Sequence, residues 1–81
     1  MYFVMVYNRV ALLRTEQNMS RQELAEKVSV NYQTIGFLER GDYFPSLELA
    51  FKIADVFGVD VTTIFSDKPF KPLFSQKGET K

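Results

Sequence analysis

Residues 20–41 read SRQELAEKVSVNYQTIGFLERG, and this stretch decides the fold. Ser20 followed by Glu23 is a capping box, in which each side chain satisfies a free backbone N–H at the start of a helix. Asn31 is a residue of the type that caps a further helix, and Gly41 suits the left-handed position that ends one. The stretch therefore predicts two short helices joined by a tight turn. This is the layout of a helix-turn-helix motif, whose second helix enters the major groove of DNA.

Helices are also expected on both sides of this motif. Before it, Asn8 is placed to cap a helix over residues 9–18. After it, Ser46 is placed to cap a helix that ends at Gly58, and Asp60 to cap a last short helix. The side chains expected to face inward are apolar and recur at three- and four-residue steps: Val10, Leu13, Leu24, Ala25, Val28, Ile35, Leu38, Leu47, Ala50, Ile53, Ala54, Phe57 and Ile64.

The two ends of the chain differ from the helical part. Residues 1–7 are rich in β-branched and aromatic side chains, which favours a strand. Residues 70–74 are its candidate partner, although Pro72 confines that segment to a sheet edge. The expected division is a DNA-binding domain over residues 8–66, an N-terminal strand over 1–7 and a partly flexible C-terminal extension over 67–81. A sheet between the two ends is left open.

The composition excludes most kinds of chemistry. The 81 residues contain no cysteine and no histidine, which removes disulfides, thiolate metal ligands and the commonest general base. We therefore expect no catalytic residue, no metal site, no cofactor and no small-molecule ligand, and the chain is not expected to be an enzyme. The apolar N-terminal residues are too few to span a membrane and lack the features of a signal peptide. A cytoplasmic protein without a membrane partner is the resulting expectation.

The charge balance leaves two hypotheses open. Ten acidic and ten basic side chains cancel, whereas DNA-binding proteins often carry a basic excess that neutralises phosphates. Three arginines nevertheless lie in or beside the motif: Arg9, Arg21 and Arg40. The first hypothesis is therefore a sequence-specific binder of double-stranded DNA. The alternative is a protein-interaction module on the same fold with little or no DNA affinity, which Tyr32 and Phe37 would favour.

The ordered set of motifs resembles the Cro/cI-type helix-turn-helix transcriptional regulators, also called the Xre family. The shared pieces keep their spacing without gaps: Asn8-Arg9-Val10, Leu13-Arg14, Ser20 through Ala25, Gln33-Thr34-Ile35, Leu38-Glu39-Arg40-Gly41, Pro45-Ser46-Leu47, Gly58-Val59 and Ile64-Phe65. The resemblance implies an all-α, lambda-repressor-like bundle of five helices that binds operator DNA as a homodimer, with repression as the expected effect. In the short members of the family, the two ends of the chain form a small antiparallel sheet.

The start of the second motif helix supplies the candidate base contacts. Gln33 leads, because its amide donates and accepts together, which suits the N7 and N6 edge of adenine. The resemblance implies that Asn31 and Tyr32 also meet bases or phosphates. Phe37, one turn further along, is placed to touch thymine methyl groups. The alternatives are a helix cap for Asn31, a solvated glutamine for Gln33 and a protein-binding surface for Phe37.

Five residues are candidate phosphate contacts: Arg21, Arg9, Thr34, Arg40 and Tyr43. Arg21 begins the first motif helix, where free backbone N–H groups already favour an anion and a guanidinium adds charge-assisted hydrogen bonds. Arg40 and Tyr43 lie around the exit of the second motif helix. A solvated side chain is the alternative for each.

Other positions are interpreted as structural. The resemblance implies a salt bridge between Arg14 and Glu39 that joins the first and third helices. Ser29 stands where the turn of the family usually has glycine, and in a left-handed conformation serine would cost roughly 1–2 kcal/mol. Gly36 lies inside a helix, where glycine costs about 1 kcal/mol relative to alanine.

Four apolar residues exceed what the inward-facing stripes need: Leu12, Phe51, Val56 and Phe65. They offer a homodimer surface, with core packing as the alternative. Two-fold pairing would set two recognition helices about one DNA turn, ~34–36 Å, apart.

Overall fold

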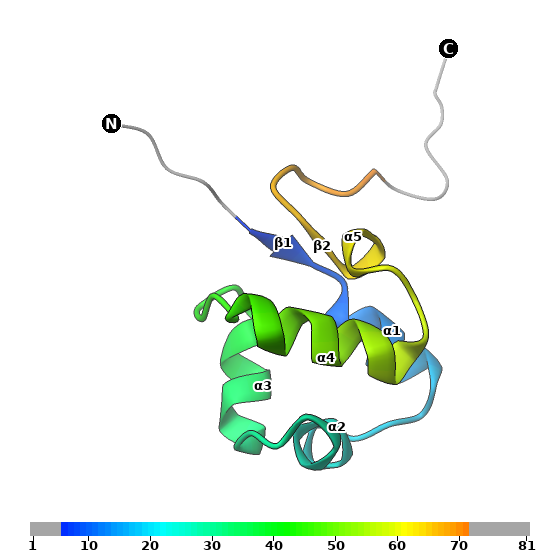
Figure 1. Ribbon diagram of the computed structural model, residues 1–81, viewed down its shortest axis with the longest axis vertical. Coiled ribbons are helices and arrows are strands. Elements are labelled where there is room, and N and C mark those ends of the chain that lie inside the picture. The colour runs from blue at the N-terminus through cyan, green and yellow to red at the C-terminus, as the bar shows by residue number, and fades with distance from the viewer. Residues whose placement is uncertain (1–5, 72–81) are drawn as a thin grey trace.

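The described part of the protein folds into five helices and a two-stranded sheet (Figure 1). The computed structural model describes residues 6–71. In chain order, the elements are β1 (Tyr7–Asn8), α1 (Val10–Glu16), α2 (Arg21–Val28), α3 (Tyr32–Glu39), α4 (Leu47–Phe57), α5 (Val61–Ile64) and β2 (Phe65–Ser66). The predicted five-helix, Cro/cI-like fold with a small antiparallel sheet is confirmed.

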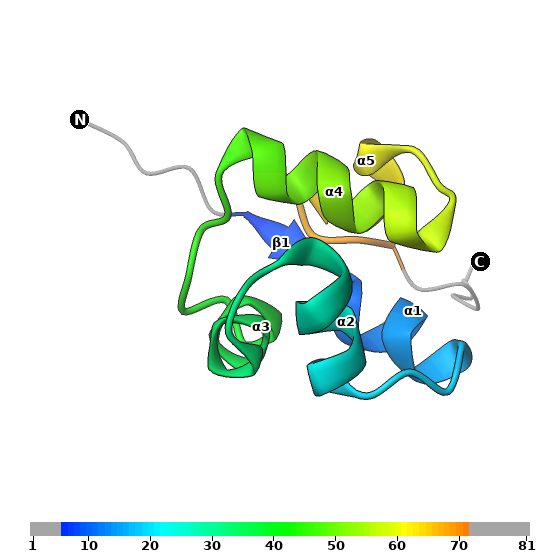
Figure 2. The ribbon, with the colours of Figure 1, turned by 60° about the horizontal axis from the view of Figure 1, so that its bottom comes forward.

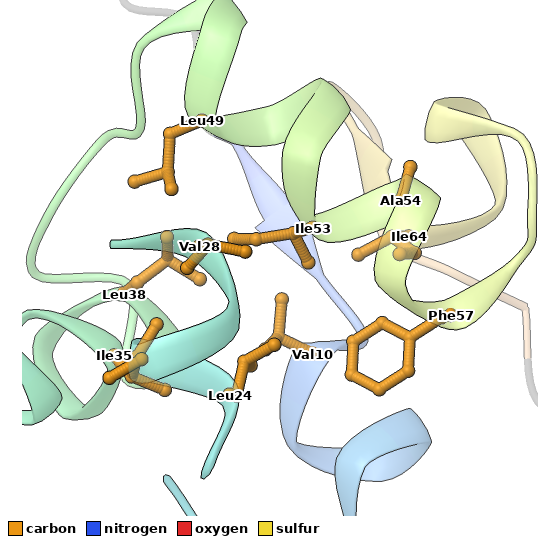
Figure 3. Packing of buried hydrophobic residues seen from close by; sticks show 11 residues of the cluster. Val10, Leu24, Val28, Ile35, Leu38, Leu49, Ile53, Ala54, Phe57 and Ile64 are labelled. Carbon is orange, nitrogen blue, oxygen red and sulfur yellow. The ribbon is translucent and has the colours of Figure 1, made fainter. Parts of the chain in front are cut away.

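The helices form two layers with one apolar core between them. Figure 2 shows α4 and α5 in one layer and α1, α2 and α3 in the other. Side chains from all five helices meet in the core, and Figure 3 shows Val10, Leu24 and Ile53 pointing toward one another. Burial of a side chain of this size stabilises a fold by about 1.5–3 kcal/mol. The core therefore holds the two motif helices, α2 and α3, against α4.

The inward face of α4 differs from the predicted face in its first turn. Leu47 is 71% exposed, whereas Leu49 is only 6% exposed. Leu49 stands one turn before Ile53 and two turns before Phe57, so these three side chains form one row that faces the core. The prediction that Leu47 faces inward was wrong, because Leu49 takes the first place in the buried stripe, whereas the other four predicted residues of α4 are buried as expected.

The predicted caps set the ends of the two motif helices. Ser20 Oγ accepts a hydrogen bond of 3.0 Å from the N–H of Glu23, whose carboxylate accepts one of 2.8 Å from the N–H of Ser20. Asn31 Oδ1 accepts a hydrogen bond of 3.0 Å from the N–H of Gln33. Gly41, after α3, has a left-handed φ of 82°. Local sequence signals therefore define both helices.

Asn8 links the start of α1 to the last turn of α3. Its Oδ1 accepts a hydrogen bond of 3.1 Å from the N–H of Val10, and its Nδ2 donates one of 2.9 Å to the carbonyl of Leu38. Asp60 occupies the cap position of α5, but its side chain forms no capping hydrogen bond, contrary to expectation. Asn8 thus bonds the first N–H of α1 from one residue before the cap position, which Arg9 occupies, and Asp60 does not form the predicted cap.

The strand β1 pairs with β2 and not with the predicted segment. The pairing is antiparallel, with Tyr7 opposite Ser66 and Asn8 opposite Phe65. Figure 1 shows the two strands side by side. β2 begins directly after the end of α5. Of the predicted partner over residues 70–74, Phe70 and the residue after it form no strand.

The burial of Ile64 explains this change of partner. Ile64 is fully buried at the end of α5, and its carbonyl accepts a hydrogen bond of 2.8 Å from the N–H of Arg9. This bond extends the ladder of β1 and β2, so pairing begins as soon as α5 ends. Residues 72–74 of the predicted partner and residues 1–5 of the predicted N-terminal strand lie outside the described residues.

The turn between α2 and α3 contains a strained serine. Ser29 has a left-handed backbone with φ 62°, a conformation that costs non-glycine residues roughly 1–2 kcal/mol. We expect Ser29→Gly to raise the free energy of unfolding by about 1 kcal/mol, measured by urea denaturation. As a control, Ser20→Gly removes a cap at an extended position, φ −77°, and should lower that free energy by a few tenths of a kcal/mol. A Ser29→Gly protein no more stable than wild type would show that the turn carries no such strain.

Candidate nucleic-acid interface

The exposed face of α3 carries the side chains expected to meet DNA. Ile35 and Leu38 point into the core and are at most 1% exposed, which leaves the other side of the helix to solvent. Tyr32 and Phe37 are 54% and 47% exposed on that helix, and Gln33 is exposed between them in the sequence. Asn31 caps the N-terminus of α3 and so fixes the start of this helix. The side chains on the outer face of α3 do not pack in the core.

Two shallow hollows meet at the start of α3. One, of about 160 Å³, is lined by Arg21, Tyr32, Gln33, Gly36, Phe37 and Arg40. The other, of about 330 Å³, faces the turn of the motif and is lined by Gln22, Ala25, Glu26, Val30, Asn31, Tyr32 and Gln33. Tyr32 and Gln33 line both hollows. The structure therefore gathers all four predicted base-contacting residues and two of the five predicted phosphate-contacting residues on one surface.

Two arginine side chains lie beside Gly36 of α3. A Cβ atom at this position would lie 3.5 Å from Nη1 of Arg40 and 4.0 Å from Nη1 of Arg21. Both distances are ordinary contacts, so packing within the protein does not itself require glycine here. Both guanidinium groups thus stand beside the same turn of α3.

Glu39 is the centre of an ion-pair cluster that joins three helices. Its side chain is 3% exposed, and its Oε2 lies 2.7 Å from Nε of Arg14 on α1. Its Oε1 lies 2.9 Å from Nε of Arg21 at the start of α2. Arg14 also donates a hydrogen bond of 2.9 Å to the carbonyl of Met19. The pair of Arg14 and Glu39 thus stands where the resemblance placed it, and Arg21 is a further partner that the sequence did not indicate.

Arg21 and Arg40 are each held by a carboxylate at the edge of the hollow. Arg21 pairs with the buried Glu39, yet its own side chain is 47% exposed. Nε of Arg40 lies 3.4 Å from Oδ2 of Asp42. The guanidinium of Arg40 also lies over the ring of Phe37, 5.0 Å from the ring centroid. The two arginines are therefore positioned by neighbours within the protein and remain open to solvent.

Three predicted phosphate contacts lie outside both hollows. The guanidinium of Arg9 lies over the ring of Phe70, 4.1 Å from its centroid. Thr34 is half-buried, and its N–H bonds to the carbonyl of Asn31 at 3.0 Å. Tyr43 is 42% exposed between α3 and α4. None of these three residues lines a hollow that Gln33 lines, although Thr34 directly follows Gln33 on α3.

Two further features are absent from the described part of the chain. Residues 6–71 contain no cluster of three acidic side chains with the spacing of a metal site. The same residues include no helix with the length and apolar character needed to cross a membrane.

Comparisons with known proteins agree with this geometry. A family model described as helix-turn-helix matches residues 10–64. An uncharacterized HTH-type transcriptional regulator of Archaeoglobus fulgidus is 49% identical over 57 residues, which cover 70% of this chain and 80% of the relative. The cryptic phage CTXphi transcriptional repressor RstR of Vibrio cholerae is 30% identical over 63 residues, covering 78% and 57% of the two chains. The crystal structure of the restriction-modification controller protein C.AhdI from Aeromonas hydrophila superimposes with a TM-score of 0.62 at 28% identity, covering 65% of this chain and 80% of that one.

Proposed function

We propose that this chain, which belongs to the Cro/cI-type helix-turn-helix family of DNA-binding transcriptional regulators, recognises a specific operator as a homodimer and represses transcription. The observation that carries the proposal is the gathering of Gln33, Tyr32 and Phe37 with two arginines on the exposed side of α3. Repression and a cytoplasmic location are part of the proposal, and the similarity to a phage repressor supports the first of these. Because family members are regulators and not enzymes, the expectation that the chain is no enzyme is confirmed.

Each residue on this face has a proposed task. Gln33 pairs with the N6 and N7 edge of an adenine, and Phe37 packs on a thymine methyl group. Tyr32 and Asn31 contact the neighbouring base or its phosphate. Arg21 donates to a backbone phosphate, because its side chain stays accessible beyond the ion pair with Glu39. Such phosphate contacts fix the register of the helix, whereas base contacts supply the sequence preference.

The remaining phosphate contacts are proposed at the edges of this surface. Arg40 and Tyr43 would reach the backbone from the end of α3 and the segment after it, and Thr34 from within α3. Arg9 would do so only by leaving the ring of Phe70. We place the DNA-binding domain at residues 8–66, with the C-terminal extension of residues 67–81 outside it.

Two observations favour the alternative of a protein-interaction module. Tyr32 and Phe37 expose aromatic surface on α3, and the chain has no net charge. Binding to DNA through phosphates weakens steeply as salt rises, whereas apolar binding to a protein does not. Salt dependence therefore separates the two functions.

The proposed function is tested by selecting binding sites from a pool of random DNA duplexes at low salt. We expect enrichment of an inverted repeat whose half-sites lie about one helical turn, ~10–10.5 bp, apart. Affinity for the enriched site should fall as salt rises. No enrichment would reject sequence-specific DNA binding, and enrichment of an unrepeated half-site would reject the homodimer.

A further inference from the structure

A missing side chain interrupts the outer face of α3. Tyr32, Gly36 and Arg40 follow one another at four-residue steps, and side chains at this spacing share one face of a helix. Gln33 and Phe37 form the neighbouring row at the same step. Because Gly36 carries no side chain, the middle of the first row is bare backbone. The smaller hollow, of about 160 Å³, lies between the two rows, and we call it the α3 hollow.

The protein itself has no need of glycine at position 36. Glycine disfavours the interior of a helix, and Gly36 lies inside α3 with no left-handed φ to require it. A Cβ atom there would make only ordinary contacts with the side chains of Arg40 and Arg21. The space at Gly36 is therefore open to a ligand of the α3 hollow.

The apolar wall of the α3 hollow is the ring of Phe37. This side chain is 47% exposed, and the guanidinium of Arg40 lies 5.0 Å from the ring centroid. Arg40 in turn pairs with Asp42 at 3.4 Å, and Arg21 pairs with Glu39 at 2.9 Å. Both arginines beside the hollow are thus engaged by carboxylates. The ring has no polar atom, so it selects an apolar group.

The major groove of DNA offers one apolar group, the C5 methyl group of thymine. An unmodified cytosine carries hydrogen at C5 and presents an N4 amino group instead. In 5-methylcytosine, the methyl group stands on the same ring carbon as in thymine. The ring of Phe37 forms no hydrogen bond with O4 of thymine or N4 of cytosine. The methyl group, and not the identity of the pyrimidine, is therefore what this wall distinguishes.

We propose that the α3 hollow binds the C5 methyl group of a pyrimidine, whether thymine or 5-methylcytosine, so that cytosine methylation strengthens binding. The methyl group lies between the ring of Phe37 and the bare backbone of Gly36. This inference rests on the proposed operator binding and deepens it. At an operator position with cytosine in place of thymine, methylation of that cytosine supplies the missing contact.

The first test changes only the methyl group on the DNA. In the operator selected by wild type, each thymine is replaced in turn by uracil, and affinity is measured by fluorescence anisotropy at constant salt. Uracil at one symmetrical pair of positions should weaken binding ~4-fold for each methyl group removed. At the same positions, a 5-methylcytosine–guanine pair should bind more tightly than a cytosine–guanine pair by the same factor. Equal binding of thymine and uracil at every position, or of cytosine and 5-methylcytosine, would overturn the proposal.

The second test changes the walls of the α3 hollow. Phe37→Ala removes the ring, and Gly36→Ala places a methyl group of the protein where that of the base would lie. Both variants should bring the ratio of thymine to uracil affinity close to one. Phe44→Ala is the matched control, because Phe44 is also exposed, at 58%, but lines neither hollow on α3. The control should keep the ratio of wild type.

Stability and operator selection separate the possible causes of failure. The urea midpoint of Gly36→Ala should not fall, because alanine favours a helix more than glycine does, so its lost ratio is not unfolding. A Gly36→Ala protein that keeps the full ratio would overturn the place of the methyl group. If wild type selects an operator that is insensitive to methyl groups, this inference is wrong and the proposed function stands. If wild type selects no sequence at all, both are rejected.

Discussion

Replacement of Glu39 by alanine should lower the free energy of unfolding by ~3–5 kcal/mol, because it leaves a partly buried arginine without its partner. Glu39 is 3% exposed in its side chain, and Arg14 is 17% exposed. Arg14 would keep its hydrogen bond to the carbonyl of Met19 but lose both carboxylate contacts. The free energy of unfolding of a small domain is only ~5–15 kcal/mol. Glu39→Ala should therefore remove a large part of the stability of this protein, as measured by urea denaturation followed by circular dichroism.

A surface ion pair provides the control for this prediction. Asp42 lies 3.4 Å from Arg40, and their side chains are 62% and 53% exposed. Exposed pairs contribute about 0–1 kcal/mol, so Asp42→Ala should change the free energy of unfolding by less than about 1 kcal/mol. If Glu39→Ala and Asp42→Ala destabilise the protein equally, the cluster around Glu39 does not hold the helices together.

The Glu39 cluster also couples stability to the proposed DNA surface. Arg21 reaches Oε1 of Glu39 with its Nε, and this contact fixes the start of α2 relative to the end of α3. A Glu39 variant that still folds would leave Arg21 free to move. Its DNA affinity would then fall for all sequences together, because contacts to phosphate position the protein without specifying bases.

Local signals explain why most helices were predictable from the sequence. A capping box, an Asn cap or a left-handed glycine acts within a few residues, so Ser20, Asn31 and Gly41 fix the ends of α2 and α3 wherever those helices pack. The start of α3 could be predicted from its cap at Asn31 in the same way. Gln33 and Phe37, one turn apart, could be assigned to its exposed side because Ile35 and Leu38 had to face inward.

Contacts between distant residues explain what the sequence did not predict. Whether β1 pairs with Phe65 or with Phe70 depends on where α5 ends, and the anchor at Ile64 that decides this is a tertiary contact. The pairing of Arg21 with Glu39 joins residues 18 positions apart on different helices, and no periodicity signals it. The burial of Leu49 in place of Leu47 depends on how α4 is rotated against the other layer.

Replacement of Gln33 by alanine should reduce discrimination at one operator position by ~1–3 kcal/mol. Gln33 is exposed and lines both hollows at the start of α3, and its backbone N–H is already satisfied by the cap at Asn31. The alanine variant keeps this backbone hydrogen bond, and alanine favours a helix more than glutamine does. The fold should therefore be unchanged while the amide that distinguishes adenine is lost. Selection from random duplexes with both proteins would show the same inverted repeat, relaxed at one symmetrical pair of positions in the variant.

Gln17 offers the matched control for this experiment. It is exposed, it stands at the end of α1, and it lines neither hollow. Gln17→Ala should select the same operator as wild type at every position. If Gln33→Ala also did so, Gln33 would be a solvated side chain, and base recognition would pass to Tyr32 and Phe37. A uniform loss of affinity in Gln33→Ala would instead assign its amide to a phosphate, because only a contact to a base edge makes the loss depend on the sequence.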